Sequence, residues 1–138
     1  LRDLVDEDTF AFNDVMAAFE LPQDTDEQKT ARQAAVEAAT LAAAAVPWKV
    51  MQAADEALSA LVVVAEKGNL NSVSDAGVAA LSLSTCFNGA RMNVEINLKD
   101  LPASPQKEEM EAGVARLAGP FDVRCKAILE TVSARMRG

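Results

Sequence analysis

Asp8 is the residue whose surroundings most strongly suggest chemistry. On a helix its neighbours at three and four residues' distance are Leu4, Val5, Ala11 and Phe12, so it falls within an apolar stripe. Burial disfavours the ionised form of a carboxyl group and raises its pKa, which suits a general acid or base. The alternative is a solvated carboxylate in an acidic first turn of the helix. The stripe makes Asp8 the first candidate for a catalytic residue.

Two asparagines form a second candidate feature. Asn93 and Asn97 are four residues apart and therefore share a helix face, with Val94, Ile96 and Leu98 around them. Amide groups on a partly buried face need hydrogen-bonding partners, which another helix, a second subunit or a polar ligand would supply. A solvated helix edge explains the pair equally well, so both interpretations stay open.

Three charged residues are weaker candidates. Asp75 falls in the first turn of an expected helix, where an aspartate stabilises the helix dipole, so a structural role comes first for it. Arg91 and Lys99 lie near the asparagine face and offer positive charge to a ligand. Scattered basic residues on an acidic chain are usually solvated, which is the simpler interpretation of these two.

The residues that the chain lacks exclude several kinds of site. Its 138 residues include no histidine, which removes a Ser-His-Asp triad and any histidine-containing metal site. Cys86 and Cys125 form no CxxC pair and cannot supply four zinc ligands, so we expect reduced thiols packed as small hydrophobic groups. No glycine-rich phosphate loop or nucleophile elbow occurs. We therefore expect neither a metal nor a redox cofactor.

The charge of the chain limits its partners. A net charge of -8 and a pI near 4.5 argue against binding to nucleic acid or to anionic membrane surfaces. No signal-peptide pattern opens the chain, and no apolar run approaches the ~18 residues that span a bilayer. These features predict a cytoplasmic protein that binds no nucleic acid and no membrane.

The elements that must position these residues are helices, because the chain is rich in alanine and poor in aromatic residues. Thr25 or Asp24 is expected to cap the second helix, and Ser72 the fourth, with Asp75 completing a capping box. Gly119-Pro120 is expected to kink or split the last helix. The prediction is an all-α, antiparallel bundle of about five helices in one domain, over residues 1–19, 25–46, 48–67, 72–99 and 106–136. The start without Met or a helix cap predicts that residues 1–138 lack the N-terminal part of that domain.

The same residues resemble a known family of folate enzymes. The segment Leu4-Val5-Asp6-Glu7-Asp8 with Ala11-Phe12 resembles LVDxDxxAF of the cyclodeaminase family, and residues 93–100 are similar to its NVxINLKD. The resemblance extends over about residues 1–101. The glycine-rich Pro-Gly-Gly-Gly-Ser type segment that opens the family's first helix is absent from this sequence. Other matching pairs follow in family order, namely Leu21-Pro22, Val46-Pro47, Gly68-Asn69, Ser74-Asp75 and Gly89-Ala90.

The resemblance implies a helical homodimer or higher homo-oligomer that binds folate at or near subunit contacts. It implies that Asp8, the second aspartate of LVDxD, is the catalytic residue. It also implies a substrate-binding role for Asp75, which matches the family's Ser-Asp pair. We expect the anionic polyglutamate tail of folate to need a basic patch. The residues expected to bind substrate are Asp75, Asn93, Asn97, Arg91, Lys99 and Arg32.

Three functions follow from the resemblance. The first is a formimidoyltetrahydrofolate cyclodeaminase, which closes the methenyl ring and releases ammonia with Asp8 as general acid and base. The alternative is a methenyltetrahydrofolate cyclohydrolase, in which a base activates water against the same carbon. The second alternative is a non-catalytic helical assembly module. A formiminotransferase domain or subunit as a partner would favour the cyclodeaminase.

Overall fold

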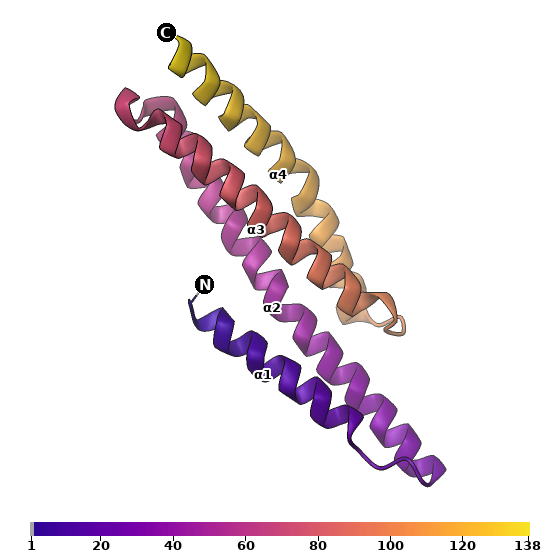
Figure 1. The fold of residues 1–138 in the computed structure, drawn as a ribbon. Helices are drawn as coiled ribbons and strands as arrows, with labels where there is room; N and C mark the ends of the chain where they lie inside the picture. Colours follow the sequence, from indigo (N-terminus) through magenta and orange to yellow (C-terminus); the bar gives the residue numbers. More distant parts are fainter. Residues whose placement is uncertain (1) are drawn as a thin grey trace.

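The computed structural model describes residues 2–138, and these form four α-helices and one short 3₁₀ helix. In chain order the elements are α1 (Arg2–Phe19), α2 (Asp26–Lys67), η1 (Leu70–Ser72), α3 (Val73–Lys99) and α4 (Pro105–Arg137). Consecutive long helices run antiparallel, with α1 beside the first half of α2 and α3 and α4 beside its second half (Figure 1). The predicted all-α class is confirmed.

The expected number of five helices is wrong, because Pro47 does not end its helix and the two helices expected on either side of it are one. Pro120 does not split the last helix either. Pro47 lies inside α2 and Pro120 inside α4, and each helix continues through the proline. A proline removes one backbone hydrogen bond and normally kinks or breaks a helix. Here buried residues on both sides of each proline, such as Ala44 and Met51 in α2, belong to the core shared with α3 and α4. This tertiary packing offsets the lost hydrogen bond.

The helix ends follow the expected capping residues except at α3. The Thr25 side chain accepts a hydrogen bond from the Gln28 backbone N–H, and the Gln28 side chain accepts one from the Thr25 N–H. This is a complete capping box. Ser72 precedes α3, but its side chain makes no capping hydrogen bond, so the expected box with Asp75 does not form. The short η1 turn leads the chain into α3 instead.

The second half of α2 forms a three-helix body with α3 and α4, which we define as residues 44–67, 73–99 and 105–137. Its centre is the stacked pair Phe87 and Phe121, whose ring centroids are 3.9 Å apart. Small side chains such as Ala54 and Ala80 fill the remaining space, which lets the helices approach closely. The body thus has a continuous buried core although the chain contains few aromatic residues.

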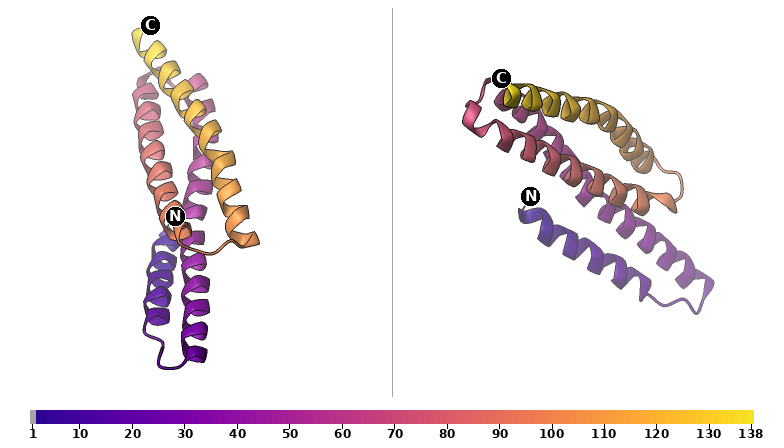
Figure 2. Two further views of the ribbon diagram at one scale, coloured as in Figure 1. Left: turned by 90° about the vertical axis from the view of Figure 1, so that its right-hand side faces the viewer. Right: turned by 45° about the horizontal axis from the view of Figure 1, so that its top comes forward.

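The first half of α2 forms a two-helix arm with α1, which we define as residues 2–43. Ala18 is the one buried residue of α1, and α2 has no buried residue before Ala44. The arm extends beyond the ends of α3 and α4 (Figure 2). It leaves six large apolar side chains exposed, namely Val5, Phe10, Phe12, Met16, Phe19 and Leu21. The arm therefore lacks a core of its own.

Helix α2 also corrects an expectation about membranes. By length and composition it is apolar enough to cross a bilayer. The central helix of a bundle has the same properties, and in this structure Met51, Ala54 and Leu58 of α2 belong to the core of the body. The length of α2 thus reflects its part in both the arm and the body.

Candidate active site

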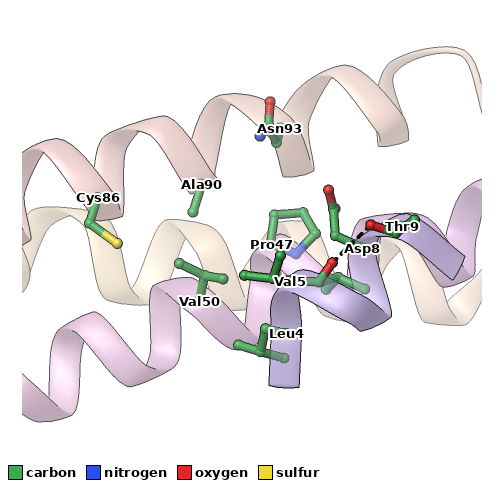
Figure 3. Close-up of a pocket in the computed structure, with 10 residues that line it drawn as sticks. Leu4, Val5, Asp8, Thr9, Pro47, Val50, Cys86, Ala90 and Asn93 are labelled. Carbon is green, nitrogen blue, oxygen red and sulfur yellow. Dashed lines mark hydrogen bonds between the residues drawn. The ribbon is translucent and has the colours of Figure 1, made fainter. Parts of the chain in front are cut away.

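The main candidate site is a hollow of about 450 Å³ where the arm meets the body. Helix α1 forms one wall, residues around Pro47 of α2 form the floor, and α3 forms the opposite wall (Figure 3). Small or short side chains, among them Pro47 and Ala90, leave this space open. The lining residues are Leu4, Val5, Asp8, Thr9, Val46, Pro47, Val50, Cys86, Ala90 and Asn93. An apolar hollow with a few polar groups is the usual form of a small-molecule site.

Asp8 and Asn93 stand on opposite walls of this hollow. Asp8 comes from α1 and its carboxylate points toward the side of the hollow formed by α3, which carries Asn93 (Figure 3). The two residues are 85 positions apart in sequence and share the hollow only because the arm folds against the body. A carboxylate and a carboxamide facing one space can accept and donate hydrogen bonds to the same bound molecule.

The expected burial of Asp8 is wrong for this chain, because its side chain is exposed. The half-buried and buried residues of α1, such as Leu4, Ala11 and Ala18, face α2. Asp8 follows their spacing, but the first turns of α1 lie over the open hollow and no side chain covers the carboxylate there. Asp8 is therefore a residue of a cavity wall and not of the core.

The two cysteines occupy different environments. Cys125 is buried in the body and its thiol donates to the Ala80 carbonyl at 3.6 Å, as expected for a packed thiol. Cys86 is half-buried and lines the hollow, so it is a wall residue of the candidate site. Both thiols are free.

The second asparagine and two basic residues lie on α3 outside this hollow. Asn97 is half-buried one turn beyond Asn93, and it does not line the cavity. Arg91 and Lys99 instead line a second hollow of about 260 Å³ between α3 and α4. The Arg91 guanidinium pairs with Glu95 at 2.7 Å, so this hollow carries both signs of charge.

Arg32 and Asp75 lie away from the candidate site. The Arg32 guanidinium donates two hydrogen bonds, at 3.1 and 3.0 Å, to the Phe19 carbonyl and lies over the Phe19 ring. Arg32 thus caps the last turn of α1 at the far end of the arm. Asp75 is exposed at the start of α3, about 27 Å of helix from Asn93 at about 1.5 Å per residue. Neither side chain reaches Asp8 within this chain.

The structure adds residues that the sequence patterns did not single out. Thr9 lines the hollow and its hydroxyl donates to the Val5 carbonyl at 3.1 Å. Lys49 forms an ion pair with Glu7, next to Asp8, with a nitrogen–oxygen distance of 2.5 Å. Glu7 and Lys49 are 42 positions apart, and no local spacing rule relates residues so distant in sequence.

The described residues, 2–138, contain no group of three or more His, Cys, Asp or Glu side chains arranged to hold a metal ion. The polar groups around the hollow are the carboxylate and hydroxyl groups of Asp8 and Thr9 on α1 and the thiol and amide groups of Cys86 and Asn93 on α3. They suit hydrogen bonding to an organic molecule.

Comparisons with known proteins bear on the family of the chain. The sequence pattern of the family described as formiminotransferase-cyclodeaminase matches residues 1–116. A methenyltetrahydrofolate cyclohydrolase of Methylorubrum extorquens is 39% identical over 99% of this chain and 65% of its own length. The formimidoyltransferase-cyclodeaminase of Rattus norvegicus is 35% identical over 98% of this chain and 25% of its own length. The chain thus spans less than two thirds of either relative.

A solved structure shares the fold. The crystal structure of formiminotetrahydrofolate cyclodeaminase from Thermotoga maritima matches with a TM-score of 0.74 and 25% sequence identity, over 99% of this chain and 62% of the other. Residues 1–116, which match the family's sequence pattern, include Asp8, Pro47 and Asn93. The parts of α1, α2 and α3 that line the hollow therefore all lie within the matched residues. Sequence and fold together show that the chain belongs to the formiminotransferase-cyclodeaminase family.

Proposed function

We propose that the protein is a methenyltetrahydrofolate cyclohydrolase, with Asp8 as the general base. The observation that carries the proposal is the hollow in which the exposed carboxylate of Asp8 faces Asn93 over an apolar floor. An apolar floor accepts a flat heterocycle, and the two polar walls orient its reacting atoms. Membership of the family supplies the class of substrate, a one-carbon derivative of tetrahydrofolate.

The reaction follows from the placement of the carboxylate. Asp8 accepts a proton from a water molecule as the water oxygen attacks the methenyl carbon, which carries a positive charge shared with both ring nitrogens. The resulting hydroxyl adduct collapses, the bond from this carbon to N5 breaks, and N5 takes a proton. The products are 10-formyltetrahydrofolate and one released proton. Asn93 is placed to hold the substrate by hydrogen bonds from the opposite wall.

The exposure of Asp8 supports the cyclohydrolase over the cyclodeaminase as the first candidate. The cyclodeaminase needs a general acid to release ammonia, a role that burial of the carboxyl group would favour, and Asp8 is exposed. The role of base needs an oxygen that reaches both solvent water and the substrate, which this position offers. The open hollow therefore favours attack by water.

Cyclodeaminase activity is the second candidate function. It is favoured by the fold shared with the T. maritima cyclodeaminase and by the likeness to the rat bifunctional enzyme. In this reaction N10 attacks the formimidoyl carbon of 5-formimidoyltetrahydrofolate and ammonia leaves with a proton supplied by Asp8. The same carbon would occupy the same hollow.

Homodimer formation is part of the proposal. Beyond the arm, α3 also exposes a row of apolar side chains at helical spacing, namely Val78, Leu81, Met92 and Ile96. Contiguous apolar surface on a soluble protein usually marks a protein contact. A second copy of the chain would cover these rows. Sedimentation over a range of concentrations tests this, and a monomer at all concentrations would contradict it.

The test of function uses the purified protein and two substrates. Loss of methenyltetrahydrofolate absorbance, faster than the uncatalysed hydrolysis and without ammonia, is the expected result with the methenyl substrate. Appearance of methenyl absorbance together with ammonia from 5-formimidoyltetrahydrofolate would establish the cyclodeaminase instead. Silence in both assays from a folded protein would contradict the proposal and favour the non-catalytic assembly module.

A further inference from the structure

The first turns of α1, which carry Asp8, have little packing to hold them in place. Of residues 2–10, Leu4 and Glu7 are half-buried and the others are exposed. Few buried contacts of α1 therefore hold the backbone at Asp8 in position. Some other contact must fix the distance between this carboxylate and the opposite wall.

In the described residues, two polar contacts join α1 to α2, one in the N-terminal half of α1 and one at its C-terminal end. At the C-terminal end, Arg32 donates to the Phe19 carbonyl. At the N-terminal end, the Lys49 ammonium pairs with the Glu7 carboxylate at 2.5 Å. Between them Ala11 and Val15 are half-buried apolar residues of α1. The pair of Glu7 and Lys49 is the polar contact nearest to the site.

The position of this pair relates it directly to the hollow. Glu7 precedes Asp8 in sequence, and Lys49 lies between the floor residues Pro47 and Val50. Glu7 is also the one acidic side chain among Asp3, Asp6, Glu7 and Asp8 that has an ion-pair partner in the described residues. One contact therefore joins the wall that carries Asp8 to the floor of the same cavity.

We propose that the Glu7–Lys49 ion pair holds Asp8 at its working distance from the substrate, so that both are positioning residues for the reaction. The inference rests on the proposed function of Asp8. Displacement of a reacting group by about 1 Å from its working geometry can cost about a hundredfold in rate. An exposed ion pair contributes little to global stability, so its effect should appear in turnover and in local opening of α1.

Charge reversal at each position and at both together tests the pair. Lys49→Glu and Glu7→Lys should each lower kcat by about fivefold to tenfold with KM changed less than about twofold, because the paired charges then repel. The double variant Glu7→Lys/Lys49→Glu re-forms the pair in the opposite sense and should recover at least half of the wild-type kcat. The conservative variant Lys49→Arg keeps the pair and should stay within about twofold of wild type.

A matched control lies on the outer face of the body. Lys126 and Glu130 form an exposed i, i+4 pair on α4, at 3.9 Å and away from the hollow. The same three charge reversals there should leave kcat unchanged. Amide hydrogen exchange of residues 6–12 supplies a readout that does not depend on turnover: it should be faster in both single variants and return to the wild-type rate in the double variant.

Two results would overturn the positioning role while leaving the proposed function intact. One is wild-type kcat in Lys49→Glu. The other is a double variant that remains as slow as the single variants, because the individual charges and not their pairing would then matter. Failure of the proposed function looks different: the wild-type protein would be silent with both substrates, or Asp8→Asn would keep full turnover. Normal exchange of residues 6–12 in the single variants would in that case remove the pair's structural role as well.

Discussion

The body and the arm share helix α2 but differ in how they are held. In the body, α2 packs against both α3 and α4 around the fully buried Phe87 and Phe121. In the arm the same helix has one neighbour, α1, and the pair buries little more than Ala18. Two helices cannot enclose a hydrophobic core, whereas three can.

This difference in packing explains why the candidate site lies between the body and the arm. The body supplies a fixed wall and floor, including Asn93 and Pro47, while the arm supplies the wall with Asp8. The hollow lies where the mostly exposed first turns of α1 face α2 and α3. A site between a rigid and a loosely held element depends on the contacts that join the two.

The largest expected effect is a difference between the body and the arm in the free energy of unfolding lost when a phenylalanine is replaced by alanine. Phe87→Ala should lower the free energy of unfolding by about 3–5 kcal/mol, because it leaves a cavity against Phe121 in the core. Phe12→Ala, on the exposed face of the arm, should change it by no more than about 0.5 kcal/mol in dilute solution. Denaturant unfolding measures both. Equal losses would contradict the division into body and arm.

A smaller and opposite pair of effects is expected for two glycines of the body. A Cβ at Gly113 would lie 2.8 Å from the Trp48 ring, so Gly113→Ala should destabilise by about 1–3 kcal/mol. Within one chain a Cβ at Gly89 meets nothing within 4 Å, so Gly89→Ala should stabilise α3 by about 0.5–1 kcal/mol in dilute solution, where the proposed dimer dissociates. Thermal unfolding followed by Trp48 fluorescence gives both signs. Destabilisation by Gly89→Ala would show that another chain covers this face.

The smallest effect is expected at the end of the arm. Arg32→Gln removes the two hydrogen bonds to the Phe19 carbonyl and the contact with the Phe19 ring. It should destabilise the last turn of α1 by about 1 kcal/mol or less, since single hydrogen bonds contribute this much. Faster amide exchange in residues 15–20 should reveal it without a change in the body. Weaker folate binding with unchanged exchange would instead restore the substrate role first expected for Arg32.

Much of the fold could be predicted from the sequence because its signals are local. Helical spacing indicated the helix over residues 1–19, Thr25 was an expected cap of α2, and the ranges expected for the last two helices, 72–99 and 106–136, agree closely with α3 and α4. The number of helices could not be predicted in the same way. Whether Pro47 ends a helix depends on what packs against both sides of it, and local rules do not contain this information.

The site was predictable only in part for the same reason. Helical spacing and family resemblance together identified Asp8 and Asn93, which the structure brings to one hollow. The apolar stripe around Asp8 indicated burial, and this indication was wrong. A stripe in the sequence does not show whether another part of the protein covers the surface that it faces. The Glu7–Lys49 pair and the wall position of Cys86 depend on how the arm lies on the body. Tertiary contacts of this kind leave no periodic signal in sequence.

The most direct test of the account is the turnover of Asp8→Asn beside that of Asp6→Asn. Both aspartates are exposed on α1, but Asp8 lines the hollow and Asp6 does not. A general base contributes about 10²- to 10⁴-fold, so Asp8→Asn should lose that much kcat with methenyltetrahydrofolate while its circular dichroism and unfolding midpoint stay unchanged. Asp6→Asn should keep wild-type turnover. A folded Asp8→Asn protein with wild-type kcat would contradict the account.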